Sequence, residues 1–76
     1  MKSKLDLHRL NHDDAYRATI NFIEMYWLKG AELEIITGNS QKMRDLVTDI
    51  LEEYKLSYTI GRKFDEFNMG YIVTWT

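Results

Sequence analysis

The stretch Leu5-Asp6-Leu7-His8 alternates apolar and polar side chains, which is the pattern of a strand with one buried face. Residues two apart in a strand point to the same side. We therefore expect Asp6 and His8 to project together, with Leu5 and Leu7 facing a core. A carboxylate beside an imidazole can support proton transfer. The same alternation is also ordinary at the half-buried edge of any sheet, so the pattern alone leaves both interpretations open.

Length and composition indicate a single domain over residues 1–76 with a small core. Hydrophobic residues make up 45% and charged residues 29%, as is usual in globular proteins. The chain has no cysteine, which excludes disulfides and thiolate zinc sites. No apolar run approaches the roughly 20 residues that span a bilayer, and no apolar signal core follows the basic start. We therefore expect a cytoplasmic domain with no membrane partner.

Two amphipathic helices follow from the spacing of apolar residues. Asn11 predicts the N-cap of the first helix, and Gly30 predicts its stop. Asn39 or Ser40 predicts the cap of a second helix that runs to about Tyr54. The apolar face of the second helix consists of Met43, Leu46, Val47, Ile50, Leu51 and Tyr54.

Three further strands are predicted over residues 32–37, 57–60 and 71–75, with a turn at Asn68-Met69-Gly70 before the last. The order β-α-β-α-β-β predicts an α/β two-layer sandwich, with a four-stranded mixed sheet and both helices on one face. We expect parallel pairing through the two helical crossovers and an antiparallel hairpin at the end. The polar side chains of the first strand would then lie on the open face of the sheet.

The opening motif and the turn Thr37-Gly38-Asn39-Ser40 before the second helix resemble the Smr (small MutS-related) domain, over residues 4–73. The usual family motif is Leu-Asp-Leu-His-Gly, and here Arg9 replaces the glycine. The second motif is commonly His-Gly-x-Gly or Thr-Gly-x-Gly, and here Ser40 replaces the second glycine. The resemblance implies a fold like the C-terminal domain of bacterial translation initiation factor three. Family members include DNA-nicking and RNA endonucleases, and others without established cleavage.

Carried over by position, Asp6 and His8 are the candidate catalytic residues, and the turn of residues 37–40 is a candidate nucleic-acid-binding segment. Backbone N–H groups at Gly38, Asn39 and Ser40 precede a helix and would suit a phosphate. If the first two strands are parallel neighbours, their carboxyl ends meet at one edge. A phosphodiester there would have His8 as general acid or base, with Asp6 orienting it. The turn can equally be only a strand-to-helix connection.

Several other side chains have two open interpretations. Basic residues either form a phosphate-steering rim or are scattered in solvent, and they are Arg9, Arg44, Arg62 and Lys63. Aromatic residues of the last two strands either stack on bases or pack against the helices, and they are Tyr58, Tyr71 and Trp75. His12 is expected in solvent, and no metal site is assigned, because a closed zinc site needs four ligands.

The leading hypothesis is a domain that acts on nucleic acid, as a structure-selective endonuclease. RNA cleavage through the 2′-OH needs no cofactor, whereas DNA cleavage needs a water and a divalent metal. The net charge of −2 argues against a general nucleic-acid coat and allows a local basic patch. The alternatives are a non-catalytic adaptor that binds nucleic acid, a ribosome or another protein, and a structural domain whose open sheet face self-associates.

Overall fold

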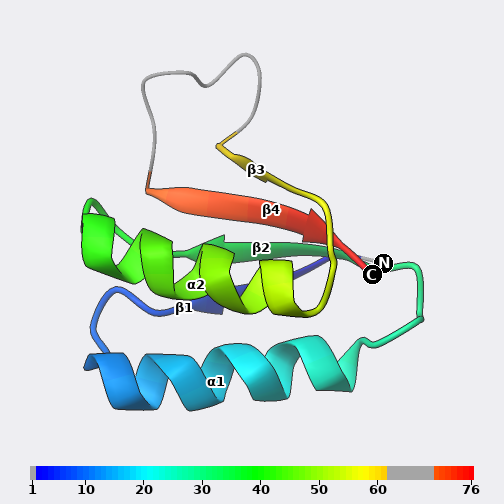
Figure 1. Cartoon of the computed structure of the whole chain (residues 1–76), viewed down its shortest axis with the longest axis horizontal. Helices are drawn as coiled ribbons and strands as arrows, with labels where there is room; N and C mark the ends of the chain where they lie inside the picture. Colours follow the sequence, from blue (N-terminus) through cyan, green and yellow to red (C-terminus); the bar gives the residue numbers. More distant parts are fainter. Residues whose placement is uncertain (1, 62–69) are drawn as a thin grey trace.

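The computed structural model describes residues 2–61 and 70–76 (Figure 1). The predicted order of strands and helices is confirmed in this structure. The elements are β1 (Lys2–Asp6), α1 (His12–Met25), β2 (Glu32–Ile36), α2 (Gln41–Glu53), β3 (Tyr58–Ile60) and β4 (Tyr71–Trp75). No helix within the described ranges is long and apolar enough to cross a membrane.

The four strands form one mixed sheet in the order β1-β2-β4-β3. β1 pairs with β2 in parallel, and β4 pairs antiparallel with both β2 and β3. The first crossover and the final hairpin are as predicted. The expected parallel pair after the second crossover is wrong, because β4 lies between β2 and β3. The burial of the strands explains this order, since four of the five residues of β4 are buried, whereas the short β3 is largely exposed and suits an edge.

Both helices cover the same face of the sheet (Figure 1). Ser3 of β1 donates a hydrogen bond to the Tyr26 hydroxyl just after α1, and Tyr58 of β3 donates to Glu52 of α2. The inter-strand register places these two strand residues on one side of the sheet. The core between the layers includes Leu7, Ala15, Phe22, Ile23, Leu33, Ile35, Met43, Val47, Ile50, Leu51 and Ile72.

The alternation in β1 has the predicted register. Leu5 packs against the core and Leu7 is fully buried, while Lys4 and Asp6 are exposed on the opposite face. His8, however, is not in the strand, which is a correction to the prediction. Leu7 continues the pairing with one more hydrogen bond, from its N–H to the Ile36 carbonyl at 2.8 Å, and the chain then turns toward α1.

The two helix caps are local and follow the sequence. The Asn11 side chain accepts a hydrogen bond from the Asp14 N–H at 2.8 Å, and the Ser40 hydroxyl accepts from the Met43 N–H at 3.2 Å. Of the two predicted caps for α2, Ser40 is therefore the one used.

The first helix is shorter than predicted: it ends at Met25, whereas the sequence predicts its stop at Gly30. The chain leaves the helix through a turn in which Leu28 has a φ of 58° and Gly30 a φ of 65°. Trp27 therefore contacts Tyr54 edge-on from this turn, with ring centroids 5.4 Å apart, and does not continue the helix face. The apolar spacing extended past the helix because the turn also packs apolar side chains.

Candidate active site

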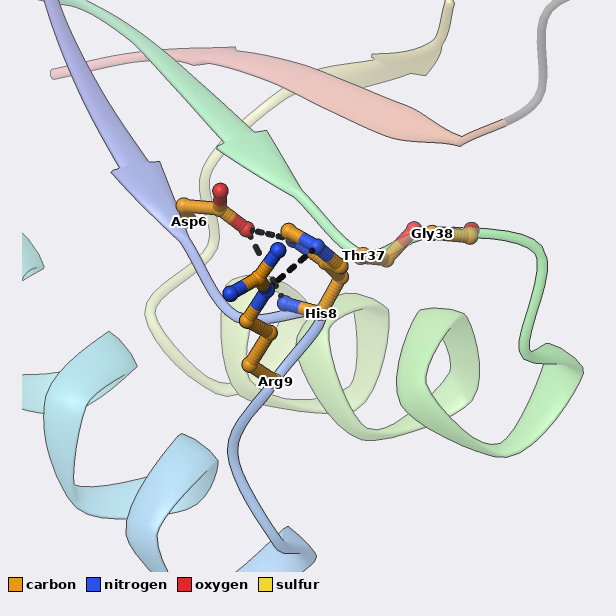
Figure 2. Close-up of polar contacts among 5 residues, drawn as sticks. All are labelled: Asp6, His8, Arg9, Thr37 and Gly38. Atoms are coloured by element: carbon orange, nitrogen blue, oxygen red, sulfur yellow. Dashed lines mark hydrogen bonds and ion pairs between the residues drawn. The ribbon is translucent and has the colours of Figure 1, made fainter.

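The carboxyl ends of β1 and β2 meet at one edge of the sheet, as the parallel pairing requires (Figure 2). Beyond these ends the two segments lie close together at His8 and Gly38. A Cβ added to Gly38 would lie 3.2 Å from the Cβ of His8. The sequence prediction that His8 and the 37–40 turn share an edge is therefore confirmed, although His8 reaches it from a turn.

Asp6 and His8 are bonded to each other twice. The Asp6 Oδ1 accepts from the His8 backbone N–H at 3.1 Å and from the ring Nδ1 (Figure 2). The second bond assigns the proton of a neutral imidazole to Nδ1 and leaves the lone pair on Nε2. The two side chains are 53% and 45% exposed, so this pair is open to a ligand. A carboxylate that holds Nδ1–H is the usual arrangement that orients a histidine for proton transfer at Nε2.

The environment keeps the Asp6 carboxyl ionised. Its pKa lies below the ordinary value, first because the His8 ring donates a hydrogen bond and next because the His8 backbone N–H donates another. The charges of His8 and Arg9 lower the pKa further, while burial acts in the opposite direction. Asp6 is thus a charged acceptor near neutral pH.

Arg9 contacts the other side of the imidazole. Its Nε–H donates to His8 Nε2 at 3.4 Å (Figure 2). The sequence leaves Arg9 either on a phosphate-steering rim or scattered in solvent, and it does not predict this contact. No periodic signal could have shown it, since neighbouring residues in a turn meet only when the backbone bends to bring their side chains together.

The 37–40 turn is more closed than the anion site expected from sequence. Thr37 is 2% exposed, and its hydroxyl donates to the Gly38 carbonyl at 3.0 Å. The backbone N–H groups of Thr37 and Gly38 both donate to the Gly70 carbonyl, at 2.8 and 3.0 Å. The Gly38 N–H is therefore not directed at a phosphate, because the pairing of β4 with β2 continues into the turn. Asn39 and Ser40 remain exposed.

Arg44 does not belong to an exposed rim. It is 9% exposed on α2, and its Nη2 donates to Gln41 Oε1 at 3.0 Å. An arginine can occupy such a buried position because its long aliphatic stem can pack against apolar neighbours. The charge of the guanidinium alone predicts an exposed side chain. Arg62 and Lys63 lie outside the described residues. Of the two predicted rim residues that are described, Arg9 is the one at the His8 edge.

The aromatic side chains of the last two strands differ in their exposure. Tyr71 is buried, and Tyr58 is half-buried against the core with its hydroxyl bonded to Glu52 at 2.9 Å. Trp75 is 43% exposed, and its indole N–H donates to Glu32 at 3.3 Å. Trp75 is therefore the one of the three that has a surface on which a base could stack.

Within residues 2–61 and 70–76, no three His, Cys, Asp or Glu side chains gather as a metal ion would require. His12 is exposed at the start of α1, as predicted.

Comparison of the chain with family models, curated proteins and solved structures found no match. The resemblance to Smr domains therefore depends on the motif residues themselves.

Proposed function

We propose that this domain acts on nucleic acid as an Smr-like endonuclease. In this proposal His8 takes a proton from the attacking hydroxyl or water, and Asp6 orients the His8 imidazole. The observation that supports this most directly is the exposed Asp6–His8 pair at the edge where two parallel strands end. Open α/β sheets bind ligands at such edges. A general base must reach the substrate proton, and the exposure of this pair allows that.

With RNA as the substrate, the chemistry needs no group beyond the protein. His8 Nε2 takes the proton of a 2′-OH, the 2′ oxygen attacks the adjacent phosphorus, and the bond from phosphorus to the 5′ oxygen breaks. The departing oxygen takes up a proton from water and His8 releases its proton to solvent, which leaves a 2′,3′-cyclic phosphate and a 5′-OH. Asp6 stabilises the imidazolium that forms in the first step. DNA has no 2′-OH and would need an activated water, with a metal ion to activate it.

The charges of the open sheet face support binding at the strand ends rather than across the sheet. Lys2 pairs with Glu32 and Lys4 pairs with Glu34, with N–O distances of 3.6 Å in both pairs. These two glutamates offset the lysines that would otherwise attract a phosphate backbone. Among the cations that the structure describes, Arg9 at the edge is therefore the one best placed to bind a phosphate.

Cleavage assays test the proposal. The purified chain is incubated with structured RNA and with supercoiled plasmid, each with and without a chelator. His8→Ala should lower the rate by at least the ~10²-fold expected for a positioned acid–base group, while His12→Ala, which changes the exposed histidine of α1, should have no effect. Full activity in His8→Ala would contradict the proposal.

A second candidate function, a non-catalytic adaptor for nucleic acid or a ribosome, is favoured by the closed turn. Of the three N–H groups expected to hold a phosphate, those of Gly38, Asn39 and Ser40, the Gly38 N–H donates instead to the Gly70 carbonyl. An adaptor would bind RNA with equal affinity in the wild type and in His8→Ala, with no cleavage by either. Fluorescence anisotropy on the same RNA distinguishes the two functions.

A further inference from the structure

Three polar groups form a hydrogen-bonded row at the end of β1, in the order Arg9, His8 and Asp6 (Figure 2). Asp6 fixes the imidazole proton on Nδ1, so Nε2 carries the lone pair. The Arg9 Nε–H lies 3.4 Å from that nitrogen and donates to it. The nitrogen that would accept a proton from a substrate is therefore already occupied by a neighbouring side chain.

The Arg9 contact is weak for a guanidinium. Its 3.4 Å exceeds the usual roughly 2.7–3.2 Å, and the acceptor is a neutral ring nitrogen. A phosphate oxygen is charged, bonds a guanidinium at about 2.7–2.9 Å and can accept two of its N–H groups together. Arg9 is exposed, so its side chain has room to move. A phosphodiester at this edge is thus the stronger acceptor for Arg9.

We propose that Arg9 masks Nε2 of His8 in the free protein and that a phosphate group of the nucleic acid draws it away. The proposal rests on the proposed function, since it concerns the regulation of the same site. Binding of the phosphate then does two things at once, because it anchors the substrate on Arg9 and exposes the base beside it. An uncharged hydroxyl compound would do neither, so the base becomes available only to phosphate-bearing substrates.

Nitrogen-15 spectra of the two histidine rings test the masking in the whole chain. At alkaline pH, where imidazoles are neutral, the Nε2 resonance of His8 should have the shift of a hydrogen-bonded acceptor. In Arg9→Ala it should move to that of an unbonded nitrogen, while Arg17→Ala, which removes an exposed arginine of α1, should leave it unchanged. His12 is the reference ring. Identical His8 shifts in the wild type and Arg9→Ala would overturn the proposal.

Inorganic phosphate tests the release. Added to the wild type, it should move the His8 Nε2 resonance toward its position in Arg9→Ala, whereas chloride at equal ionic strength should not. In Arg9→Ala phosphate should cause no such movement. If phosphate shifts the Arg9 resonances in the wild type while Nε2 stays bonded, the guanidinium binds anions without uncovering His8, and the proposal is wrong.

Kinetics separate this proposal from the endonuclease itself. For RNA cleavage, Arg9→Ala should raise KM about tenfold, for the loss of one charge-assisted contact, and leave kcat within about twofold, because the base is already free. Arg9→Lys should restore much of the KM. Release of Nε2 by phosphate in a wild-type chain that cleaves nothing would support the masking and refute the endonuclease. If the wild type cleaves RNA and Arg9→Ala leaves KM unchanged, the endonuclease is supported and the masking is refuted.

Discussion

His8 and Gly38 lie at the ends of two parallel strands, so close that a Cβ on Gly38 would be 3.2 Å from the Cβ of His8. Gly38 also has a φ of +69°, a conformation that side chains other than glycine rarely adopt. The position of His8 and the backbone of the turn are therefore linked sterically, because any side chain at position 38 would meet His8. A glycine is needed here for both reasons.

We expect Gly38→Ala to destabilise the domain more than Gly30→Ala does. Gly30 has a φ of +65° and nothing within 4 Å of an added Cβ, so alanine there costs only the backbone strain of ~1–2 kcal/mol. Alanine at 38 adds the contact with His8. Urea unfolding measures the difference, and NMR should show the His8 ring displaced in Gly38→Ala only. Equal losses of stability with an unmoved ring would contradict the linkage.

Leu7 should be a major contributor to stability, because it is fully buried. Leu7→Ala is expected to cost on the order of 2–5 kcal/mol of unfolding free energy, as buried large-to-small changes do. Leu28→Ala is the matched control, since Leu28 is 78% exposed and should lose little. His8→Ala should also cost little. A His8 variant that unfolds while the Leu7 variant stays folded would mean that the register of β1 is wrong by one residue.

Several features predicted correctly from sequence are set by neighbours along the chain. The caps at Asn11 and Ser40 are hydrogen bonds to an N–H three residues on, and local chemistry decides them. The alternation of Leu5 and Leu7 is similarly local, since a strand with one buried face must show it.

Several of the features that were missed depend on segments far apart in sequence, although the contact between Arg9 and His8 is local. The sheet places β4 between β2 and β3, and no local sequence pattern determines which of the last two strands pairs with β2. The Gly70 carbonyl accepts the hydrogen bonds from the 37–40 turn because β4, which Gly70 precedes, pairs with β2. Arg44 is buried because its stem can be covered by the fold around α2.

Acid should remove a contribution that Asp6 makes to stability. Its pKa is lowered in the folded state by the hydrogen bonds from His8, so the contribution is fully present above the unfolded pKa. It is lost as the pH falls below about 4 and through the folded pKa. Between pH 2 and 5, the unfolding free energy of Asp6→Asn should depend less on pH than that of the wild type, measured by urea titration at each pH. Parallel curves would show that the bonds to His8 do not favour the carboxylate.

Nucleic-acid binding should depend on Arg9 more than on Lys4. Lys4 pairs with Glu34 at 3.6 Å on the sheet face, whereas Arg9 lies at the strand-end edge beside His8. With a single-stranded RNA, Arg9→Ala should weaken binding and reduce the salt slope by about 0.7, the value for one phosphate contact. Lys4→Ala should leave the slope unchanged. Anisotropy titrations over a range of salt concentrations check this, and a larger loss in Lys4→Ala would place the RNA across the sheet.

If the domain cleaves, Asp6 should act through His8. Asp6 holds Nδ1–H and so directs the lone pair of the imidazole to Nε2, and it has no role once the imidazole is gone. His8→Ala should lower the rate by at least ~10²-fold, and Asp6→Ala should lower it substantially with folding preserved. The double variant should be scarcely slower than His8→Ala, because the two residues work as a unit. Additive losses would instead give Asp6 a separate task, such as holding a metal ion, and cleavage should then stop with chelator. A product with a cyclic phosphate end that forms in the presence of chelator would identify the 2′-OH as the nucleophile.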